Sequence, residues 1–161
     1  MDPAGIEIER KFLVAELPAG LEQHPAEPIE QGYVVIGDDG VEVRVRRRAG
    51  RSTLTVKSAP GELRIEEEIP IDERQFASLW QLSEGRRISK TRHLVPVGPG
   101  LTAELDVYHG PLEGLLTAEV EFPSLAESRR FVPPAWIADE VTGDARYANQ
   151  SLALDGAPSP G

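Results

Sequence analysis

Apolar and polar residues alternate along most of the chain with a repeat of two. Because successive side chains of a β-strand point to opposite faces of a sheet, this alternation predicts strands with one apolar and one polar face. Turn-forming residues separate the alternating segments, as antiparallel connections require. We expect strands at residues 6–14, 31–36, 42–48, 52–58, 63–71, 88–95, 101–108 and 115–122. Many short strands with such turns predict a mainly β meander or barrel.

Helical signals interrupt this alternation at a few places. Asp72 can cap a helix over residues 72–82, in which the apolar residues follow helical spacing, and we expect this helix to pack outside the sheet. A second short helix is predicted over residues 124–131, which also opens on a capping residue. A turn is expected over residues 134–141 and a terminal helix over residues 147–154.

The length of 161 residues, of which 40% are hydrophobic, fits one globular domain. We expect residues 1–155 to form that domain and residues 156–161, which hold two Gly and two Pro, to form a flexible tail. The chain shows neither a signal-peptide pattern nor the roughly 20 apolar residues of a membrane helix. A cytoplasmic protein is therefore the expectation.

The net charge and the cysteine content exclude several kinds of partner and of catalytic or metal site. The formal net charge of −10 is the wrong sign for a protein that grips nucleic acid or an anionic membrane, so neither is an expected partner. The chain contains no cysteine, which excludes disulfides, thiol catalysis, zinc ribbons and iron–sulfur clusters. Any metal must then be held by oxygen or histidine ligands.

The polar face of the predicted strands carries charges at i, i+2 spacing. The acidic positions of this pattern are Glu7, Glu9, Glu66, Glu68, Glu104, Asp106, Glu119 and Glu121. The cationic positions are Lys11, Arg44, Arg46, Lys57, Arg64, Lys90 and Arg92. One interpretation is a solvated face with surface salt bridges, each worth about 0 to 1 kcal/mol. The other is the interior of a barrel, which must then be hydrated and functional because burying an ion costs several kcal/mol.

The second interpretation points to a specific class of ligand. Carboxylates two residues apart on a strand lie about 7 Å apart and point the same way, so they can converge on a hard cation such as Mg²⁺ or Mn²⁺. Arginine and lysine side chains at the same spacing can hold successive phosphates of a linear polyanion. A polyphosphate with a divalent metal satisfies both sets of charges.

Short motifs along residues 5–155 resemble a known family in their order. They are Glu7-x-Glu9-x-Lys11, Gln31-Gly32-Tyr33, Arg44-Val45-Arg46, Leu54-Thr55-Val56-Lys57, Arg64-x-Glu66-x-Glu68, Lys90-Thr91-Arg92, Glu104-Leu105-Asp106, Glu119-Val120-Glu121 and Val141-Thr142-Gly143-Asp144. The chain thus resembles the CYTH, or triphosphate tunnel metalloenzyme, superfamily, and is most similar to its short stand-alone bacterial members. The resemblance implies an eight-stranded antiparallel β-barrel that forms a tunnel, with a few helices packed outside.

The resemblance also implies a role for each charged position. The implied phosphate-binding residues are Lys11, Arg44, Arg46, Lys57, Arg64, Lys90 and Arg92. The implied ligands of a first metal are Glu7, Glu9, Glu119 and Glu121, and those near a second metal are Glu66, Glu68, Glu104 and Asp106. The catalytic positions are Lys11, Glu66, Glu68 and Asp106. The roles of five further residues stay open, namely Tyr33, Tyr108, Arg86, Arg87 and Arg146.

The expected function is metal-dependent hydrolysis of a phosphoanhydride bond, with two Mg²⁺ or Mn²⁺ ions and inorganic triphosphate as substrate. The expected partner is this small molecule, with a homodimer as one option. Three alternatives remain at this stage: a nucleoside or thiamine triphosphatase, a class IV-type adenylate cyclase, and a polyphosphate-binding module without catalysis.

Overall fold

The computed structural model describes residues 8–58 and 65–159 and shows a mainly β chain with a few helices. The strands are β1 (Ile8–Val14), β2 (Ala26–Ile36), β3 (Glu42–Arg48), β4 (Arg51–Lys57), β5 (Glu66–Ile71), β6 (Arg87–Gly98), β7 (Leu101–Tyr108), β8 (Leu116–Phe122) and β9 (Ile137–Glu140). The α-helices are α1 (Glu73–Gln81), α2 (Leu125–Arg130) and α3 (Asn149–Asp155). Short 3₁₀ helices cover Leu21–Gln23, Gly110–Leu112 and Ala145–Tyr147. The predicted fold class is confirmed.

The strands follow the order β5-β4-β3-β2-β6-β7-β8-β1-β9 in one sheet. Within the described residues, β5 and β9 end this order without pairing to each other, so the sheet is not closed and the closed barrel expected from the sequence is not observed. The ninth strand occupies part of residues 134–141, where we expected a turn. Its Ile137 pairs with Val14 of β1, and four residues are too few to show a repeat of two.

The chain divides into two compact units, each assembled from several segments. Unit 1 comprises residues 1–27, 91–108 and 113–145, and unit 2 comprises residues 28–90, 109–112 and 146–161. Strands β2 and β6 contribute residues to both units. The expectation that residues 1–155 form one domain stays a prediction, as does the flexible tail.

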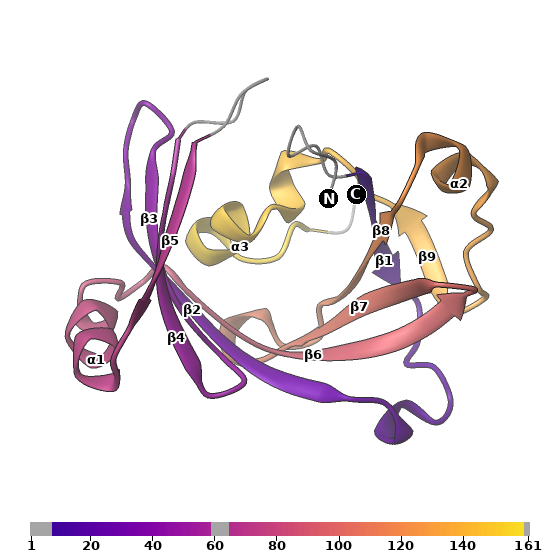
Figure 1. Ribbon diagram of the computed structural model, residues 1–161, viewed down its shortest axis with the longest axis horizontal. Helices are drawn as coiled ribbons and strands as arrows, with labels where there is room; N and C mark the ends of the chain where they lie inside the picture. Colours follow the sequence, from indigo (N-terminus) through magenta and orange to yellow (C-terminus); the bar gives the residue numbers. More distant parts are fainter. Residues whose placement is uncertain (1–7, 59–64, 160–161) are drawn as a thin grey trace. The chain divides into compact units, whose positions relative to one another are not determined.

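Unit 1 builds its core on the apolar face of β1, β7 and β8. Buried residues of this cluster are Phe12, Ala103, Ala118, Val120, Phe122 and Ile137. Helix α2 packs against β1 and β8, and Phe131, which follows it, contacts Phe12 and Phe122 (Figure 1). The opposite face of the same strands is left for the charged residues.

Arg10 ties three elements of unit 1 together at the rim of this core. Its guanidinium donates to both carboxylate oxygens of Glu140 in β9, at 2.7 and 3.1 Å, and to the Ser128 carbonyl at the end of α2, at 2.8 Å. The hydrogen bond from Arg10 holds the pKa of Glu140 below its ordinary value. The bidentate pair thereby anchors β9 beside β1.

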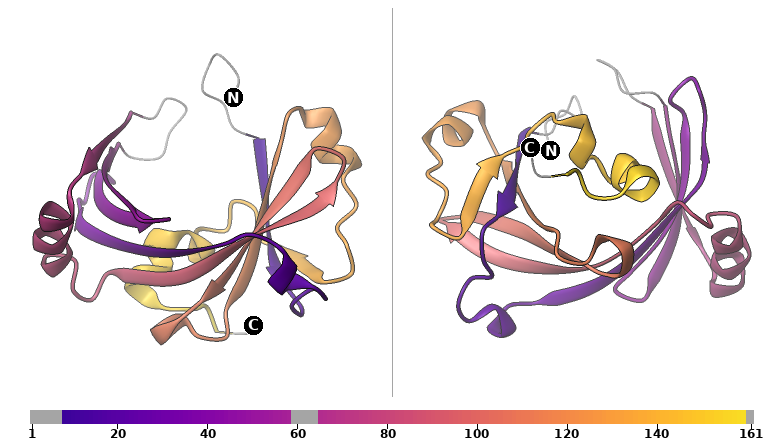
Figure 2. Two further views of the ribbon diagram at one scale, coloured as in Figure 1. Left: turned by 60° about the horizontal axis from the view of Figure 1, so that its bottom comes forward. Right: turned by 180° about the vertical axis from the view of Figure 1, so that it is seen from behind.

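Unit 2 carries α1 on its apolar face. Asp72 and Gln75 form a reciprocal capping box that starts the helix, as the capping pattern predicted. Phe76 is buried, stacks on Trp80 at 5.4 Å between ring centroids, and lies beneath the Arg47 guanidinium at 4.2 Å. Helix α1 contacts β3 and β4, whereas α3 lies on the other side of these strands (Figure 2). The expected outer position of α1 is confirmed.

The loop after α1 is packed closely against β2. A Cβ atom on Gly32 would lie 2.4 Å from Ser83 Oγ and 2.7 Å from Ser83 Cβ, so only glycine fits there. Arg86 donates to the carbonyls of Tyr33 and Leu82, at 2.9 and 2.7 Å. These contacts fix the part of β2 that carries the motif Gln31-Gly32-Tyr33.

In the described part of the chain, no helix is long and apolar enough to cross a membrane.

Candidate active site

The charged residues of unit 2 share one face of β3, β4 and β5. Arg44 lies opposite Thr55, and Thr55 lies opposite Glu68, so the three form one row across the strands. Lys57 and Glu66 form the adjacent row. The face is therefore continuous over three strands, as the i, i+2 spacing predicted.

Burial decides between the two interpretations of this pattern. Among the described residues, Lys90 is 1% exposed, Asp106 2%, Arg44 6% and Arg92 7%. Side chains on a solvated face do not lose this much contact with water. The charged face is interior at these positions, and the cost of burying the charges must be met by partners or a ligand.

A neutral side chain holds one of the predicted phosphate ligands in unit 2. Gln31 is fully buried, and its Oε1 accepts a hydrogen bond from Arg46 Nε at 2.8 Å. Its Nε2 donates to the Tyr33 hydroxyl, also at 2.8 Å. Tyr33 therefore faces the charged side of β2, and burial raises its pKa. Gln31, Tyr33 and Arg46 form a single hydrogen-bonded unit, which we call the amide clamp.

The sequence identified Gln31 only as part of a family motif and indicated no role for it, because the predicted site residues were the charged ones and Gln31 carries no charge. Its position along the strand was nevertheless informative. Gln31 and Tyr33 are two residues apart, so their side chains share a face of β2, and they lie opposite Arg46 and Arg44 of β3. Glu42, which shares the parity of Arg44, is also buried, at 5% exposure. Polar residues on the same face of a strand as a charged row, whether charged or not, are thus the signal that finds such positions.

The acidic candidates of β5 are more exposed than the cations beside them. Glu68 accepts a hydrogen bond from Thr55 Oγ1 at 2.8 Å, and Glu66 lies 3.7 Å from Lys57 Nζ. Both carboxylates lie on the exposed edge strand of unit 2. They are available to a ligand from solvent, as a substrate or metal site requires.

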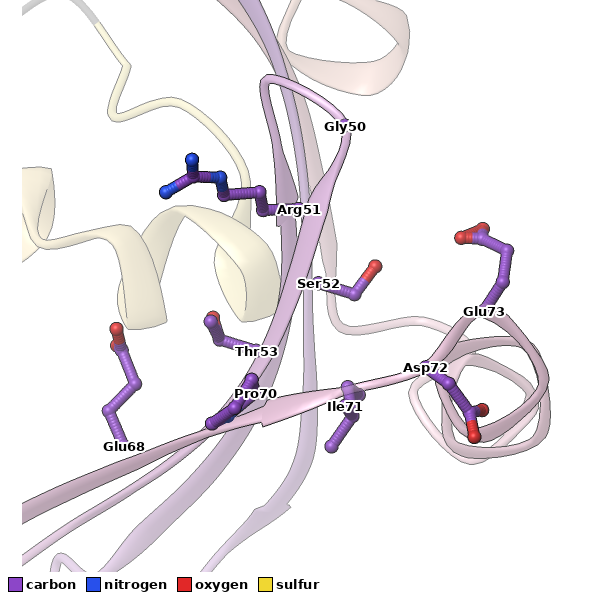
Figure 3. A pocket seen from close by; sticks show the side chains of 9 residues that line it. All are labelled: Gly50, Arg51, Ser52, Thr53, Glu68, Pro70, Ile71, Asp72 and Glu73. Atoms are coloured by element: carbon purple, nitrogen blue, oxygen red, sulfur yellow. The ribbon is translucent and has the colours of Figure 1, made fainter.

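A pocket of about 610 Å³ lies at this edge of unit 2. Arg51, Thr53 and Glu68 point to one side of the strands, the side on which α3 lies (Figure 3). Ser52, Asp72 and Glu73 point to the other side (Figure 3). Only the first group belongs to the charged face, so the pocket touches the candidate site at Glu68 without coinciding with it.

In unit 1 a second charged row crosses β1, β8 and β7. Lys11 lies opposite Glu119, and Glu119 lies opposite Glu104. Lys11 Nζ is 3.5 Å from Glu119 Oε1. Two carboxylates that face each other on neighbouring strands repel, and a cation between them removes this repulsion. Lys11 supplies part of that charge.

Arg92 is locked by carboxylates in unit 1. Its Nε and one terminal nitrogen donate to the two oxygens of Asp106, at 2.8 and 3.0 Å, and its other terminal nitrogen lies 2.5 Å from Glu104. The Arg92 and Asp106 side chains are only 8% and 3% exposed. Burial alone would lower the pKa of Arg92, but these carboxylates outweigh it and raise the pKa. We call this arrangement the carboxylate clamp.

Tyr108 continues the charged face of β7 beyond Asp106. It is 1% exposed, and burial raises its pKa, as does the nearby charge of Asp106. A hydrogen bond with the Thr117 side chain acts in the opposite direction. Tyr108 is therefore a neutral phenol that faces the charged side of unit 1 at neutral pH.

The remaining metal candidates do not form a ready cluster. Glu9 and Glu121 are exposed and lie opposite each other on β1 and β8. In the two described stretches of chain, no three acidic or histidine side chains come together as a metal-binding group. Glu7 and Arg64 lie outside the described residues, so their predicted roles are not placed.

The arginines left open by the sequence have structural partners. Arg87 donates to the Trp80 carbonyl at 2.6 Å and to Ser83 Oγ at 3.1 Å, and its guanidinium lies 4.5 Å from the centroid of the Trp80 ring. Arg86 holds β2, as described above. Arg146 lies 5.7 Å from the centroid of the neighbouring Tyr147 ring. Arg86 and Arg87 thus stabilise the connection after α1.

Comparison with known proteins places this geometry in a class. No protein-family model matches the chain. A Hippeastrum protein with a dominant triphosphatase activity shares the fold, at a TM-score of 0.52 and 17% identity over 78% of this chain and 83% of that one. A crystal structure of an inorganic triphosphatase matches with a TM-score of 0.79 and 44% identity over 97% of each chain. The fold is that of the CYTH class.

Sequence relatives identify the family within that class. The inorganic triphosphatase of Nitrosomonas europaea is 47% identical over 148 residues, which are 92% of this chain and 97% of the relative. The inorganic triphosphatase of Acetivibrio thermocellus is 38% identical over 92% of this chain and 93% of the relative. The chain belongs to the inorganic triphosphatase family, and the resemblance noted in the sequence is confirmed.

Proposed function

We propose that this protein hydrolyses the terminal phosphoanhydride bond of inorganic triphosphate with the help of Mg²⁺ or Mn²⁺. The family relationship supports the reaction class, since both named relatives are inorganic triphosphatases. In this proposal the cations of the charged face of unit 2 bind the phosphates. Metal binding is assigned to the carboxylates of β1, β5, β7 and β8.

The observation that carries the proposal is the state of Arg44. Its Nε is buried, yet this donor has no hydrogen-bond partner among the described residues. A buried donor without an acceptor costs about 1–3 kcal/mol, so such a group is kept where a ligand supplies the acceptor. A phosphate oxygen is the acceptor that matches arginine best. Arg46, two residues further on the same face, extends this contact to a second phosphoryl group.

The donor set also fits a divalent metal. Glu104 faces Glu119, and Glu9 faces Glu121, so each pair offers oxygen ligands and gains from an added positive charge. Mg²⁺ is commonly held by one or two carboxylates together with substrate phosphates, so pairs of carboxylates suffice. The absence of cysteine favours such a hard cation.

The side chains then divide the chemical work. Arg44, Arg46, Lys57 and Lys90 bind and orient the phosphates, and they stabilise the charge that develops on the transferred phosphoryl group. A bound divalent metal supplies charge neutralisation and lowers the pKa of water. Arg92, whose three nitrogens are held by Asp106 and Glu104 in the carboxylate clamp, fixes the positions of these two carboxylates. No covalent enzyme intermediate is required.

The test is phosphate release from tripolyphosphate, compared with pyrophosphate, ATP and thiamine triphosphate, in the presence of Mg²⁺ or Mn²⁺. We expect tripolyphosphate to give the highest kcat/KM and EDTA to abolish release. Glu119→Gln removes a proposed carboxylate ligand of the metal and should lower kcat/KM by about 10²-fold, because the metal supplies several kcal/mol of charge stabilisation. Exposed Glu113→Gln is the matched control. Full activity of Glu119→Gln, or no phosphate release by the native protein, would refute the proposal.

The same panel separates the alternatives left open by the sequence. A class IV-type cyclase would convert ATP to cyclic AMP, whereas a triphosphatase releases phosphate. A thiamine triphosphatase needs an aromatic platform, but Trp80 stacks on Phe76 and Trp136 packs on the core of unit 1. Binding without turnover would favour a non-catalytic module. A cytoplasmic location and a homodimer remain predictions.

A further inference from the structure

We propose that Gln31 is a positioning residue for Arg46 and that its neutrality is the property the site requires. The proposal rests on the function proposed above and concerns how one phosphate-binding arginine is prepared for its ligand. Its basis is the amide clamp, in which Gln31 is fully buried and bonded to both Arg46 and Tyr33.

The orientation of the Gln31 amide is fixed by its two neighbours. Arg46 has only donors, so it must meet the carbonyl oxygen of the amide, and the amide nitrogen then points to the Tyr33 hydroxyl. A flipped amide would place its NH₂ group against the guanidinium. The two bonds therefore hold the amide in one orientation, and the amide holds the plane of the Arg46 guanidinium.

Gln31 uses only the Nε–H of Arg46, because the bond is to that atom alone. The terminal nitrogens, which form the fork that matches a phosphate, are not used by Gln31. An amide adds no negative charge beside Arg46, whereas a carboxylate in the same place would add one. The bond from Gln31 thus fixes the direction of the guanidinium without adding a charge that repels an anion.

Burial makes Arg46 sensitive to any charge placed at position 31. Gln31 has no contact with solvent, and Tyr33 is 2% exposed. In such a setting electrostatic interactions are weakly screened, so an added negative charge acts strongly on Arg46. Gln31→Glu keeps the size of the side chain and its acceptor for Arg46 while adding that charge.

The experiment compares Gln31→Glu and Gln31→Leu with the exposed control Gln81→Glu, which makes the same change in net charge. KM and kcat for tripolyphosphate are measured, together with tripolyphosphate binding by calorimetry without divalent metal. We expect both Gln31 variants to raise KM and the dissociation constant by about tenfold or more, which corresponds to the loss of one charge-assisted contact. The change in kcat should be smaller, and Gln81→Glu should match the native protein.

A double-mutant cycle shows whether Gln31 acts through Arg46. Lysine at position 46 lacks the Nε–H that Gln31 accepts, so adding Gln31→Leu to Arg46→Lys should raise KM little further. Multiplicative effects, or an unchanged KM in Gln31→Glu, would overturn the positioning role. If Gln31→Leu fails to fold, the near-isosteric Gln31→Glu decides. Failure of the native protein to bind or hydrolyse tripolyphosphate would instead refute the proposed function.

Discussion

The two clamps hold a predicted phosphate-binding arginine in opposite ways. In unit 1, Arg92 is gripped by two carboxylates, and all three of its donor nitrogens face an acid. In unit 2, Arg46 is held through Nε by the neutral amide of Gln31. The first arrangement holds the arginine rigidly and places negative charge on it, whereas the second fixes its direction and adds no negative charge.

The sequence pattern gives Arg46 and Arg92 the same role, but the structure distinguishes an arginine held for stability from one held in position for a ligand. A buried ion pair stabilises the fold only while both partners are present, since removal of one leaves an uncompensated charge. A neutral partner carries a smaller risk of this kind and adds no negative charge beside the arginine. We therefore expect replacements in the carboxylate clamp to act mainly on stability and those in the amide clamp mainly on substrate binding.

The largest expected effect comes from Asp106→Asn. This change removes one of the two carboxylates that face the buried Arg92 and leaves Glu104 as the other, so we expect a loss of about 2–3 kcal/mol in the free energy of unfolding. Gln31→Glu should lose less than about 1 kcal/mol. Urea unfolding followed by tryptophan fluorescence measures both. Equal urea midpoints for the two variants would contradict the contrast between the clamps.

Substitution of each arginine by lysine is the next test. Arg92→Lys cannot reproduce the parallel bonds to Asp106, so we expect a loss of about 2 kcal/mol in the free energy of unfolding. Arg46→Lys should cost about 1 kcal/mol or less while raising KM for tripolyphosphate. Arg74→Lys, on the exposed face of α1, is the control. The comparison fails if Arg46→Lys is the less stable variant.

A third change disturbs the support of the amide clamp without touching it. Gly32→Ala would place a Cβ atom against Ser83, and we expect a loss of about 1–3 kcal/mol through this overpacking. Adding Ser83→Gly removes both clashing atoms and should restore part of the loss in the unfolding free energy. The thermal midpoint of the single and double variants reports the effect. An unchanged midpoint for Gly32→Ala would show that the loop can move away freely.

The smallest effect is expected at the exposed Arg10–Glu140 pair, which is an ion pair outside the clamps. Because the folded pKa of Glu140 is lowered, its contribution is present above the unfolded pKa of about 4.3 and is lost as pH falls through the folded value. Glu140→Gln should cost less than about 1 kcal/mol at pH 7. The difference in unfolding free energy from the native protein should disappear in acid. A difference that grows in acid would contradict this assignment.

Sequence reasoning recovered most of the fold because the alternation of apolar and polar residues is strong. Each expected strand exists, and the charged parity of β3 and β7 leads to side chains that are indeed buried, such as Arg44 and Asp106. Strand β9 was not predicted because four residues are too few to show an alternation of apolar and polar side chains. Whether the sheet is open or closed was not predictable either, because it does not depend on local sequence patterns. The expected closure of the barrel was therefore wrong for the described residues.

Within the candidate site, the sequence predicted charges but not their partners. The alternation of side chains along a strand cannot show that both oxygens of Asp106 accept hydrogen bonds from Arg92. This pairing depends on how β6 and β7 bring the two side chains together. No role was predicted for Gln31 for a related reason, since its importance lies in two hydrogen bonds rather than in charge. The assignments of metal and phosphate ligands remain predictions.

Strand β1 illustrates what this topology demands of the protein during its synthesis. Arg10 and its partner Glu140 are 130 positions apart, and β1 lies between β8 and β9 in the sheet. A ribosome that adds 5–20 residues per second needs roughly 6–26 s to produce the partners of β1. During that time the strand has an apolar face and unpaired edges, so we expect molecular chaperones to bind the nascent chain there.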